Sequence, residues 1–135
     1  MILAIDTSTQ WMGIAILDGR LILYEKIWKT NRRHTVELAA AIKAAFQDSD
    51  TNPEDLTAIA VAVGPGSFTS LRIGLAAAKG FSLSLKIPII GVPSLDITAN
   101  GIPSQDIDLI CTLRAGRGRL AVLKYDNENG KWESR

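Results

Sequence analysis

One short stretch restricts the possible folds of this chain more than any other. Residues 56–63 are almost all apolar and rich in β-branched side chains, and they run directly into Gly64-Pro65-Gly66. Such a run is typical of a strand that is buried on both faces of a sheet. Apolar residues then recur at helical spacing up to Leu85, with Ser67 or Thr69 placed to cap the start. The stretch therefore predicts a strand, a sharp turn and a helix in succession.

The flanking segments complete a mixed α/β pattern. Periodicity and turn residues predict further strands and helices at residues 1–6, 11–17, 21–27, 35–46, 87–92 and 95–99. An antiparallel meander that feeds two right-handed crossovers gives a mixed sheet with helices packed on it. This is the ribonuclease H-like arrangement that actin-like ATPase (ASKHA) domains duplicate, although the same order of elements also suits many other α/β domains. Residues 108–126 add a hairpin, and a short segment at 131–133 follows it.

Composition and charge exclude several classes of function. With 15 basic and 14 acidic residues, the formal charge of +1 predicts no global attraction to nucleic acid or to an anionic membrane, so any RNA contact must be local or indirect. Arg72, Lys79 and Lys86 interrupt the most apolar stretch, and we therefore expect no membrane span. The single cysteine, Cys111, cannot form an intramolecular disulfide, which favours a reducing compartment and hence the cytoplasm.

Two loops contain residues that suit a nucleotide phosphate. The first follows the opening strand and offers hydroxyls, backbone amides and one carboxylate, and the second joins a buried strand to a helix N-terminus, which favours anions. Ordinary turn formation explains both loops at least as well, because Asp, Ser and Thr bond to their own backbone and glycines permit a sharp turn. The candidate residues of this vestigial nucleotide site are Asp6, Thr7, Ser8, Thr9, Gly64 and Gly66.

Other polar side chains have simpler explanations than chemistry. His34 is the only histidine, and a solvent-exposed or capping role is favoured over metal binding because no second histidine follows at helical spacing. Arg114, Arg117 and Arg119 form a small basic stretch with Lys124 that suits RNA phosphates, but a solvated hairpin edge explains it more simply. We expect no catalytic residue and no metal site.

Small residues dominate both long predicted helices. The first carries alanines at 39–41, 44 and 45, and the second carries small residues at 74, 76–78 and 80. Either the helices pack closely on their own sheet, or their remaining alanine and leucine surface docks a partner. The residues alone leave both alternatives open.

Three segments together resemble the TsaB (YeaZ) family. They are Ile2–Thr9, the specific segment Val63–Gly74 (VGPGSFTSLRIG), and Gly91–Asp96. The resemblance implies a non-catalytic partner or scaffold of the TsaD synthase in threonylcarbamoyladenosine (t6A) modification of tRNA. It also implies that a TsaE ATPase acts on the pair and that tRNA is contacted only indirectly. No cofactor is expected, beyond weak binding of ATP or ADP.

The resemblance further implies how members pair and what this chain lacks. TsaD-like relatives carry two metal-ligating histidines where this chain has Ser94 and Thr98, and hydroxyls do not replace imidazoles as iron or zinc ligands. Neither metal-dependent nor glycoprotease-type peptidase activity is therefore expected. Family members pair through the two helices, as homodimers or with TsaD. The residues implied in or directly beneath that interface are Leu38, Ile42, Leu71, Leu75 and an exposed Ala78.

Two departures from the family pattern stand out. Ser70 occupies a position where the family generally has glycine, and residues 114–119 (RAGRGR) replace an Asp-Ala-Arg-x-Gly-Glu stretch. The resemblance implies an actin-like ATPase-type domain over 1–104 and the start of a truncated second lobe over 105–135. Two alternatives to the partner role are a nucleotide-binding actin-like ATPase and a homodimeric paralogue that no longer binds TsaD.

Overall fold

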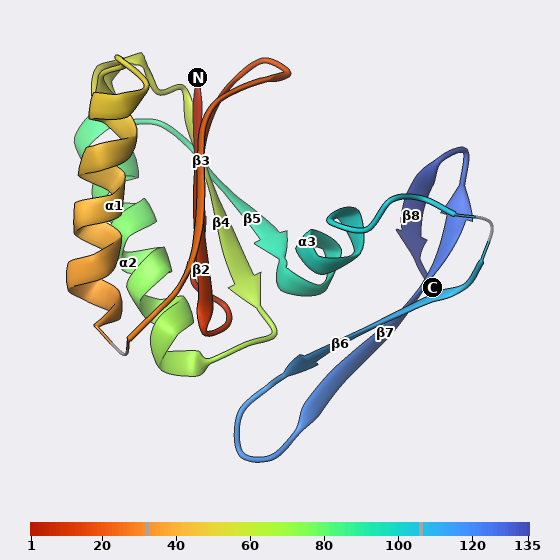
Figure 1. The fold of residues 1–135 in the computed structure, drawn as a ribbon. Coiled ribbons are helices and arrows are strands. Elements are labelled where there is room, and N and C mark those ends of the chain that lie inside the picture. The colour runs from red at the N-terminus through yellow and green to blue at the C-terminus, as the bar shows by residue number, and fades with distance from the viewer. Residues whose placement is uncertain (32, 106) are drawn as a thin grey trace.

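The computed structural model describes residues 1–31, 33–105 and 107–135, and it contains two separate sheets (Figure 1). The strands are β1 Ile2–Asp6, β2 Trp11–Asp18, β3 Leu21–Lys29, β4 Ala58–Gly64, β5 Ile89–Pro93, β6 Leu109–Arg114, β7 Leu120–Glu128 and β8 Lys131–Ser134. The α-helices are α1 His34–Asp48, α2 Phe68–Leu85 and α3 Ser94–Asn100, with a 3-10 turn at Pro53–Asp55. These elements confirm the predicted α/β class. None of the described helices is both long enough and apolar enough to cross a membrane.

The first sheet has five strands in the order β3-β2-β1-β4-β5. β1 pairs antiparallel with β2 and parallel with β4, so that Leu3 lies between Ile16 on one side and Ile59 on the other. β5 extends the sheet parallel to β4. The sheet combines antiparallel and parallel pairs because of the connections between its strands. A short turn suffices for the antiparallel hairpins, whereas the connections that lead to the parallel strands β4 and β5 pass through α1 and α2, respectively.

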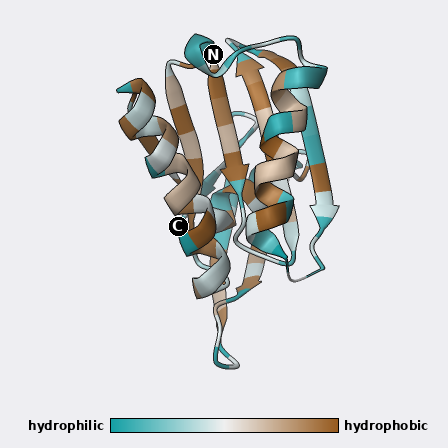
Figure 2. Ribbon diagram, turned by 90° about the vertical axis from the view of Figure 1, so that its left-hand side faces the viewer, coloured by the Kyte–Doolittle hydropathy of each residue, from teal (hydrophilic) through white to brown (hydrophobic). Residues whose placement is uncertain are grey.

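The main core lies between this sheet and the helices α1 and α2, which cover one face side by side and begin at the same end (Figures 1 and 2). Alternate residues of each strand point toward the helices. Leu3 and Ile5 on β1 and Ile59 and Val61 on β4 are accordingly at most 2% exposed. The strand predicted from residues 56–63 is therefore an interior strand, between β1 and β5, as its composition indicates.

Three small residues of the second helix face the sheet. Ser70, Gly74 and Ala78 recur every four residues on one face of α2, and all three are buried. A Cβ at Gly74 would lie 2.5 Å from Thr7 Oγ1, so the close approach requires glycine. Ala78 is 0% exposed, and the prediction that it is exposed is wrong. Its spacing from Gly74 places it on the sheet side of the helix, whereas Ala76 faces outward.

The second sheet is smaller and antiparallel throughout, in the order β6-β7-β8. Tyr125 donates its hydroxyl to Asp96 Oδ1 at 2.6 Å, and Trp132 Nε1 donates to the carbonyl of Ile102 at 2.9 Å. Burial and the Asp96 carboxylate raise the pKa of the Tyr125 hydroxyl, which therefore remains a donor. The sheet packs on α3 in a second core of Leu95, Ala99, Cys111, Tyr125 and Trp132. The domain boundary at residue 104 stays a prediction, although α3, which precedes it, contributes to this core.

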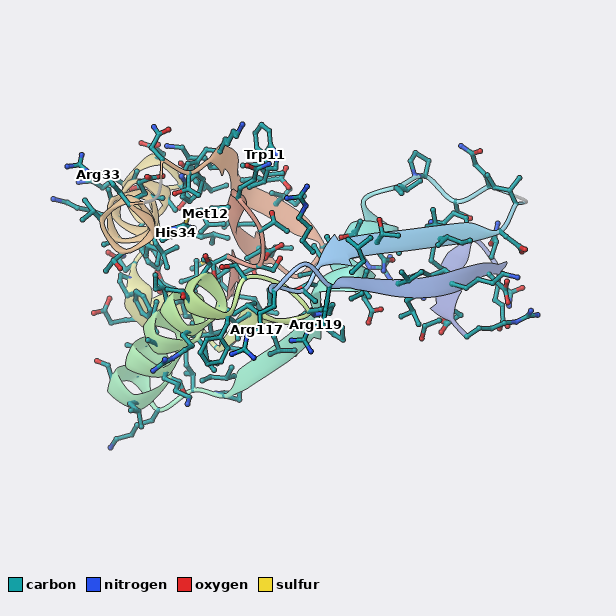
Figure 3. The ribbon with its side chains drawn as sticks, turned by 90° about the horizontal axis from the view of Figure 1, so that it is seen from below. Trp11, Met12, Arg33, His34, Arg117 and Arg119 are labelled. Atoms are coloured by element: carbon teal, nitrogen blue, oxygen red, sulfur yellow. The ribbon has the colours of Figure 1, made fainter. Side chains whose placement is uncertain are left out.

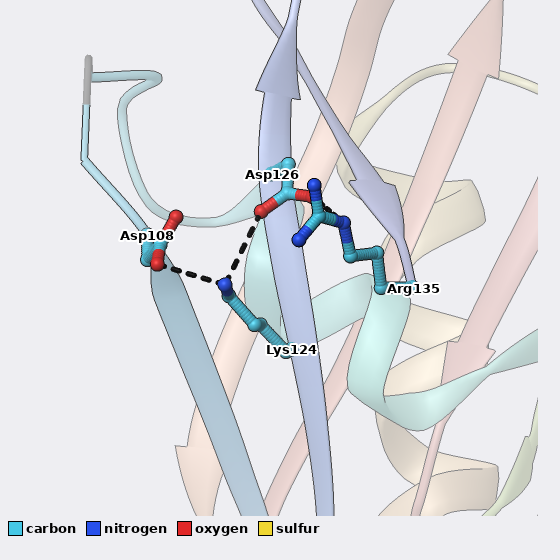
Figure 4. A network of polar contacts seen from close by, with 4 residues as sticks. All are labelled: Asp108, Lys124, Asp126 and Arg135. Carbon is cyan, nitrogen blue, oxygen red and sulfur yellow. Dashed lines mark ion pairs between the residues drawn. The ribbon is translucent and has the colours of Figure 1, made fainter.

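Ion pairs lie on the surface of the second sheet (Figure 4). Lys124 Nζ is 2.8 Å from Asp108 Oδ2 and 3.8 Å from Asp126 Oδ1, and Arg135 also pairs with Asp126. Exposed pairs of this kind contribute little to stability. They do neutralise Lys124, which is thereby separated from the basic stretch with which the sequence grouped it.

Candidate functional site

An apolar groove of about 1150 Å³ runs between α1 and α2, on the face that Figure 2 presents. The rings of Phe46 and Phe81 lie across it with centroids 6.3 Å apart and planes tilted by 43°. Lys43, Asp50 and Arg72 add charge to the lining. The apolar lining includes Leu38, Ile42, Phe46, Ile73, Ala76 and Phe81. An apolar centre bordered by charged groups is the usual composition of a protein–protein interface.

Small side chains keep this groove open. Ala39 on α1 and Ala76 on α2 both line the groove and are exposed, so neither side chain fills the space between the helices. Ala40, the neighbour of Ala39, is also exposed but does not line the groove. The sequence left open whether the alanines pack on the sheet or form a surface for a partner. The structure shows both, because some alanines pack on the sheet and others border the open groove.

The predicted interface residues fall into two groups. Leu38 and Ile42 line the groove, where they form a floor that is only 2% and 7% exposed. Leu71 and Leu75 are half-buried on α2 and do not line it, and Ala78 lies in the main core. Their part in pairing stays a prediction. Helical spacing alone did not separate the alanines that face the groove from their neighbours.

The two predicted phosphate loops pack against each other. The N-cap residue of α2 donates its backbone N–H to Ser8 O at 2.8 Å, and a Cβ on Gly66 would lie 2.3 Å from the same oxygen. Gly64 has φ +105°, which glycine adopts at little cost. Thr7 is 1% exposed and donates its hydroxyl at 2.7 Å to a backbone carbonyl of α2. The glycines and Thr7 therefore have a packing role.

Three of the predicted nucleotide residues face a second cavity. Asp6, Ser8 and Thr9 line a space of about 410 Å³ on the opposite face of the sheet, next to α3. Asp6 Oδ1 accepts the N–H of Ser8 at 2.8 Å, and Thr9 Oγ1 accepts that of Trp11 at 3.0 Å, as in ordinary turns. Gly64 lines neither of these two cavities. The same is true of Gly66, so the structure does not bring the two loops together around one open space.

The only histidine links the two helices. His34 is the first residue of α1, and its Nε2 lies 3.0 Å from the hydroxyl of Ser70, which donates to Ser67 Oγ at 2.9 Å. Arg33 holds the N-cap position of α1, and the Ser67 side chain makes no capping bond to α2. The capping role considered for His34 is therefore wrong, whereas one of the two predicted hydroxyl residues, Ser67, does occupy the N-cap position of α2. Ser70, at a position where family resemblance implies glycine, is the centre of this network.

Comparison with known proteins identifies the family. A family model described as "TsaD: tRNA N6-adenosine threonylcarbamoyltransferase" matches residues 28–134. The "tRNA threonylcarbamoyladenosine biosynthesis protein TsaB" of Bacillus subtilis (strain 168) is 39% identical over 133 residues, which are 98% of this chain and 58% of that relative. The chain belongs to the TsaB (YeaZ) family. The TsaB of Escherichia coli (strain K12) is 33% identical over 135 residues, covering 97% of this chain and 58% of that relative.

Solved structures show the same fold as this TsaB family member. "YeaZ from Pseudomonas aeruginosa" superposes with a TM-score of 0.86 at 22% identity, covering 99% of this chain and 63% of that one. A second Pseudomonas aeruginosa structure, described as similar to peptidase YEAZ, gives 0.88 at 23% identity, with 99% and 62% coverage. The chain spans about 58% of the length of the curated TsaB relatives just named.

Proposed function

We propose that this chain is a non-catalytic partner of a TsaD-type synthase in threonylcarbamoyladenosine modification of tRNA, in the cytoplasm. The observation that carries the proposal is the apolar groove between α1 and α2. Apolar surface gains free energy when a partner removes it from water, by about 25 cal/mol per Å². A groove of this size on a folded domain therefore favours association over a free-standing role.

The choice of partner rests on shared helices. The TsaD family model matches residues 28–134, which include both α1 and α2, so we infer that a TsaD-type synthase carries an equivalent helical pair. Two such pairs can meet face to face and cover both grooves in a four-helix contact. The same geometry permits a homodimer when the synthase is absent. A TsaE-type ATPase then acts on the assembled pair.

The non-catalytic role rests on the chemistry of α3. Ser94 is 1% exposed and its hydroxyl has no hydrogen-bond partner among the described residues, whereas Thr98 donates its hydroxyl to the Ser94 backbone carbonyl at 3.0 Å. Family resemblance puts metal-ligating histidines of the synthase at these two positions. Neutral hydroxyls are poor ligands for iron or zinc, and the partner must supply the metal chemistry.

Light scattering on mixtures with a TsaD-type synthase tests the proposal. The expected result is a complex that Ala39→Arg or Ala76→Arg in the groove abolishes, because a charged side chain then occupies the contact. Ala40→Arg is the matched control, since it places the same charge on the adjacent exposed position outside the groove. Equal association of all three variants, or no complex with the unaltered chain, contradicts the proposal.

A second candidate function is nucleotide binding, which the cavity lined by Asp6, Ser8 and Thr9 favours. Isothermal titration with ATP separates the two candidates. Micromolar binding accompanied by hydrolysis supports an actin-like ATPase. Weak binding without hydrolysis supports the partner role.

A further inference from the structure

The small net charge conceals a separation of charge along the molecule. At the end where α1 and α2 begin, the exposed cations are Lys29, Arg33, Arg72, Arg114, Arg117 and Arg119. At the opposite end of the first sheet and its helices, two exposed cations, Arg20 and Lys86, are outnumbered by the exposed acids Asp18, Asp48, Asp50, Glu54 and Asp55. We call the first of these the basic end.

Four parts of the chain contribute to the basic end: the end of β3, the starts of α1 and α2, and the β6–β7 hairpin. In Figures 1 and 2 the tip of the β6–β7 hairpin projects beyond the starts of α1 and α2. Figure 3 views this end from below and shows Arg33 at the start of α1 and Arg117 and Arg119 on the hairpin. Strand β3 ends at Lys29 on the same side. Residues far apart in the sequence therefore give this end an excess of positive charge.

These cations are available to an outside partner. Within the described residues, the ion pairs join Lys124 and Arg135 to carboxylates of the second sheet and involve none of the cations of the basic end. Two carboxylates lie close by, but each is bonded within the chain. Asp6 accepts the N–H of Ser8, and Glu37 accepts Trp28 Nε1 at 2.9 Å.

Exposed aromatic rings accompany the charge. Trp11 opens β2 and is 53% exposed, and Phe68 opens α2 and is 74% exposed. Every other aromatic residue of the chain is buried or half-buried. The guanidinium of Arg72 lies 5.4 Å from the centre of the Phe68 ring. Rings next to cations are the combination that proteins use to stack unpaired bases and hold phosphates.

The hairpin turn holds its arginines in a defined loop. Ala115 N donates to Arg119 O at 2.9 Å, and Arg119 N donates to Gly116 O at 3.0 Å. Arg117 has φ 51°, a left-handed conformation in which glycine is less strained. An arginine at this position costs folding energy, which favours a role for its side chain outside the fold.

We propose that the basic end binds RNA directly, with the arginines contacting phosphates and Trp11 and Phe68 stacking on unpaired bases. The identity of the RNA as tRNA rests on the proposed function. The proposal replaces the expectation that this chain contacts tRNA only indirectly. A stretch that differs from the family pattern, residues 114–119, supplies half of the cations.

Fluorescence anisotropy with an unmodified tRNA transcript tests the proposal without any synthase, so its outcome is independent of partner binding. The triple variant Arg114→Gln/Arg117→Gln/Arg119→Gln should bind at least tenfold more weakly. The slope of log association constant against log salt concentration should become shallower by about 2 to 3, since each lost phosphate contact reduces the slope by roughly 0.9. Arg117→Lys, which keeps the charge, should bind like the unaltered chain.

The matched control removes the same charge elsewhere. Arg20→Gln/Lys79→Gln/Lys86→Gln neutralises exposed cations away from the basic end and should change affinity less than twofold. Trp11→Ala/Phe68→Ala should weaken binding to the transcript but not to a fully paired RNA duplex, which offers no free bases. Equal losses for the two charge variants, or no binding by the unaltered chain, overturn the proposal.

Discussion

In the first sheet, two helices of 15 and 18 residues close one face, and large apolar side chains from three strands fill a contiguous core. The second sheet is covered by a single helix of 7 residues, and the core between them is small. The Tyr125 hydroxyl and the Trp132 ring N–H add hydrogen bonds to Asp96 and to the Ile102 carbonyl. The outer face of the second sheet leaves Ile110, Leu120 and Val122 more than half exposed. Most of the buried apolar surface that stabilises the fold therefore lies between the first sheet and its two helices, whereas the second sheet buries its apolar side chains against α3.

The largest effect is expected from a charge placed in the main core. Ala78→Arg should lower the free energy of unfolding by about 4 kcal/mol or more, because a cation without a partner is forced between α2 and the sheet. Denaturant unfolding followed by circular dichroism measures the loss. Ala76→Arg, two residues away and exposed, should stay within about 0.5 kcal/mol of the unaltered chain. A stable Ala78→Arg protein contradicts this description of the core.

Loop packing in the first sheet should give the next largest effect. Gly66→Ala should destabilise by about 3 kcal/mol, because its Cβ meets Ser8 O and backbone does not yield easily. Gly80→Ala is the control, since nothing lies within 4 Å of its Cβ, and it should stabilise the helix by about 0.5 to 1 kcal/mol. Thermal unfolding of both variants measures the two effects. Shifts of the midpoint that are similar in size and direction contradict the close contact between the loops.

A hydrogen bond in the second sheet should have a smaller and more local effect. Tyr125→Phe removes the bond to Asp96 and should cost about 2 kcal/mol, as for other bonds to a charged acceptor. Hydrogen exchange should then speed up in α3 and β6–β8 while β1 and β4 keep their protection. Uniform acceleration across both sheets shows that the two regions unfold as one unit.

The strand, turn and helix at residues 56–85 were predictable because composition and spacing specify them locally. The pairing of β8 in the second sheet was harder to predict, because a strand of four residues carries little periodic signal. The burial of Ala78 and the outward position of Ala76 depend on how α2 is rotated against the sheet, which adjacent alanines do not reveal.

The site was harder to predict than the fold. The contact between His34 and Ser70 joins residues 36 positions apart, and only the tertiary structure brings them together. The same holds for the basic end, whose cations come from several distant segments. The groove could be anticipated as a helical surface, but the residues facing it could not.

Two carboxylates offer the smallest test of the comparison. A hydrogen bond from Trp28 is the main cause that lowers the pKa of Glu37 in the first region, and a hydrogen bond and charge from Lys124 lower that of Asp108 in the second. Each ionised group therefore adds stability above its ordinary pKa, 4.5 for Glu37 and 3.8 for Asp108, and the contribution is lost as pH falls through the lowered value.

Salt should distinguish these two carboxylates. High salt screens the exposed Asp108 pair but leaves a neutral donor such as the Trp28 ring largely unaffected. We expect the thermal midpoint to fall in acid, and each variant to lack the part of that fall caused by its own carboxylate. In 1 M salt the difference between Asp108→Asn and the unaltered chain should disappear, whereas the difference between Glu37→Gln and the unaltered chain should persist. Identical salt responses contradict the assignment of the two causes.

Formation of threonylcarbamoyladenosine on a tRNA transcript tests the central claim most directly. The account predicts no product from this chain alone, product when a TsaD-type synthase and its ATPase are added, and a loss of that stimulation with Ala76→Arg but not with Ala40→Arg. Modified tRNA formed by the purified chain alone contradicts the account, as does full synthase activity in its absence.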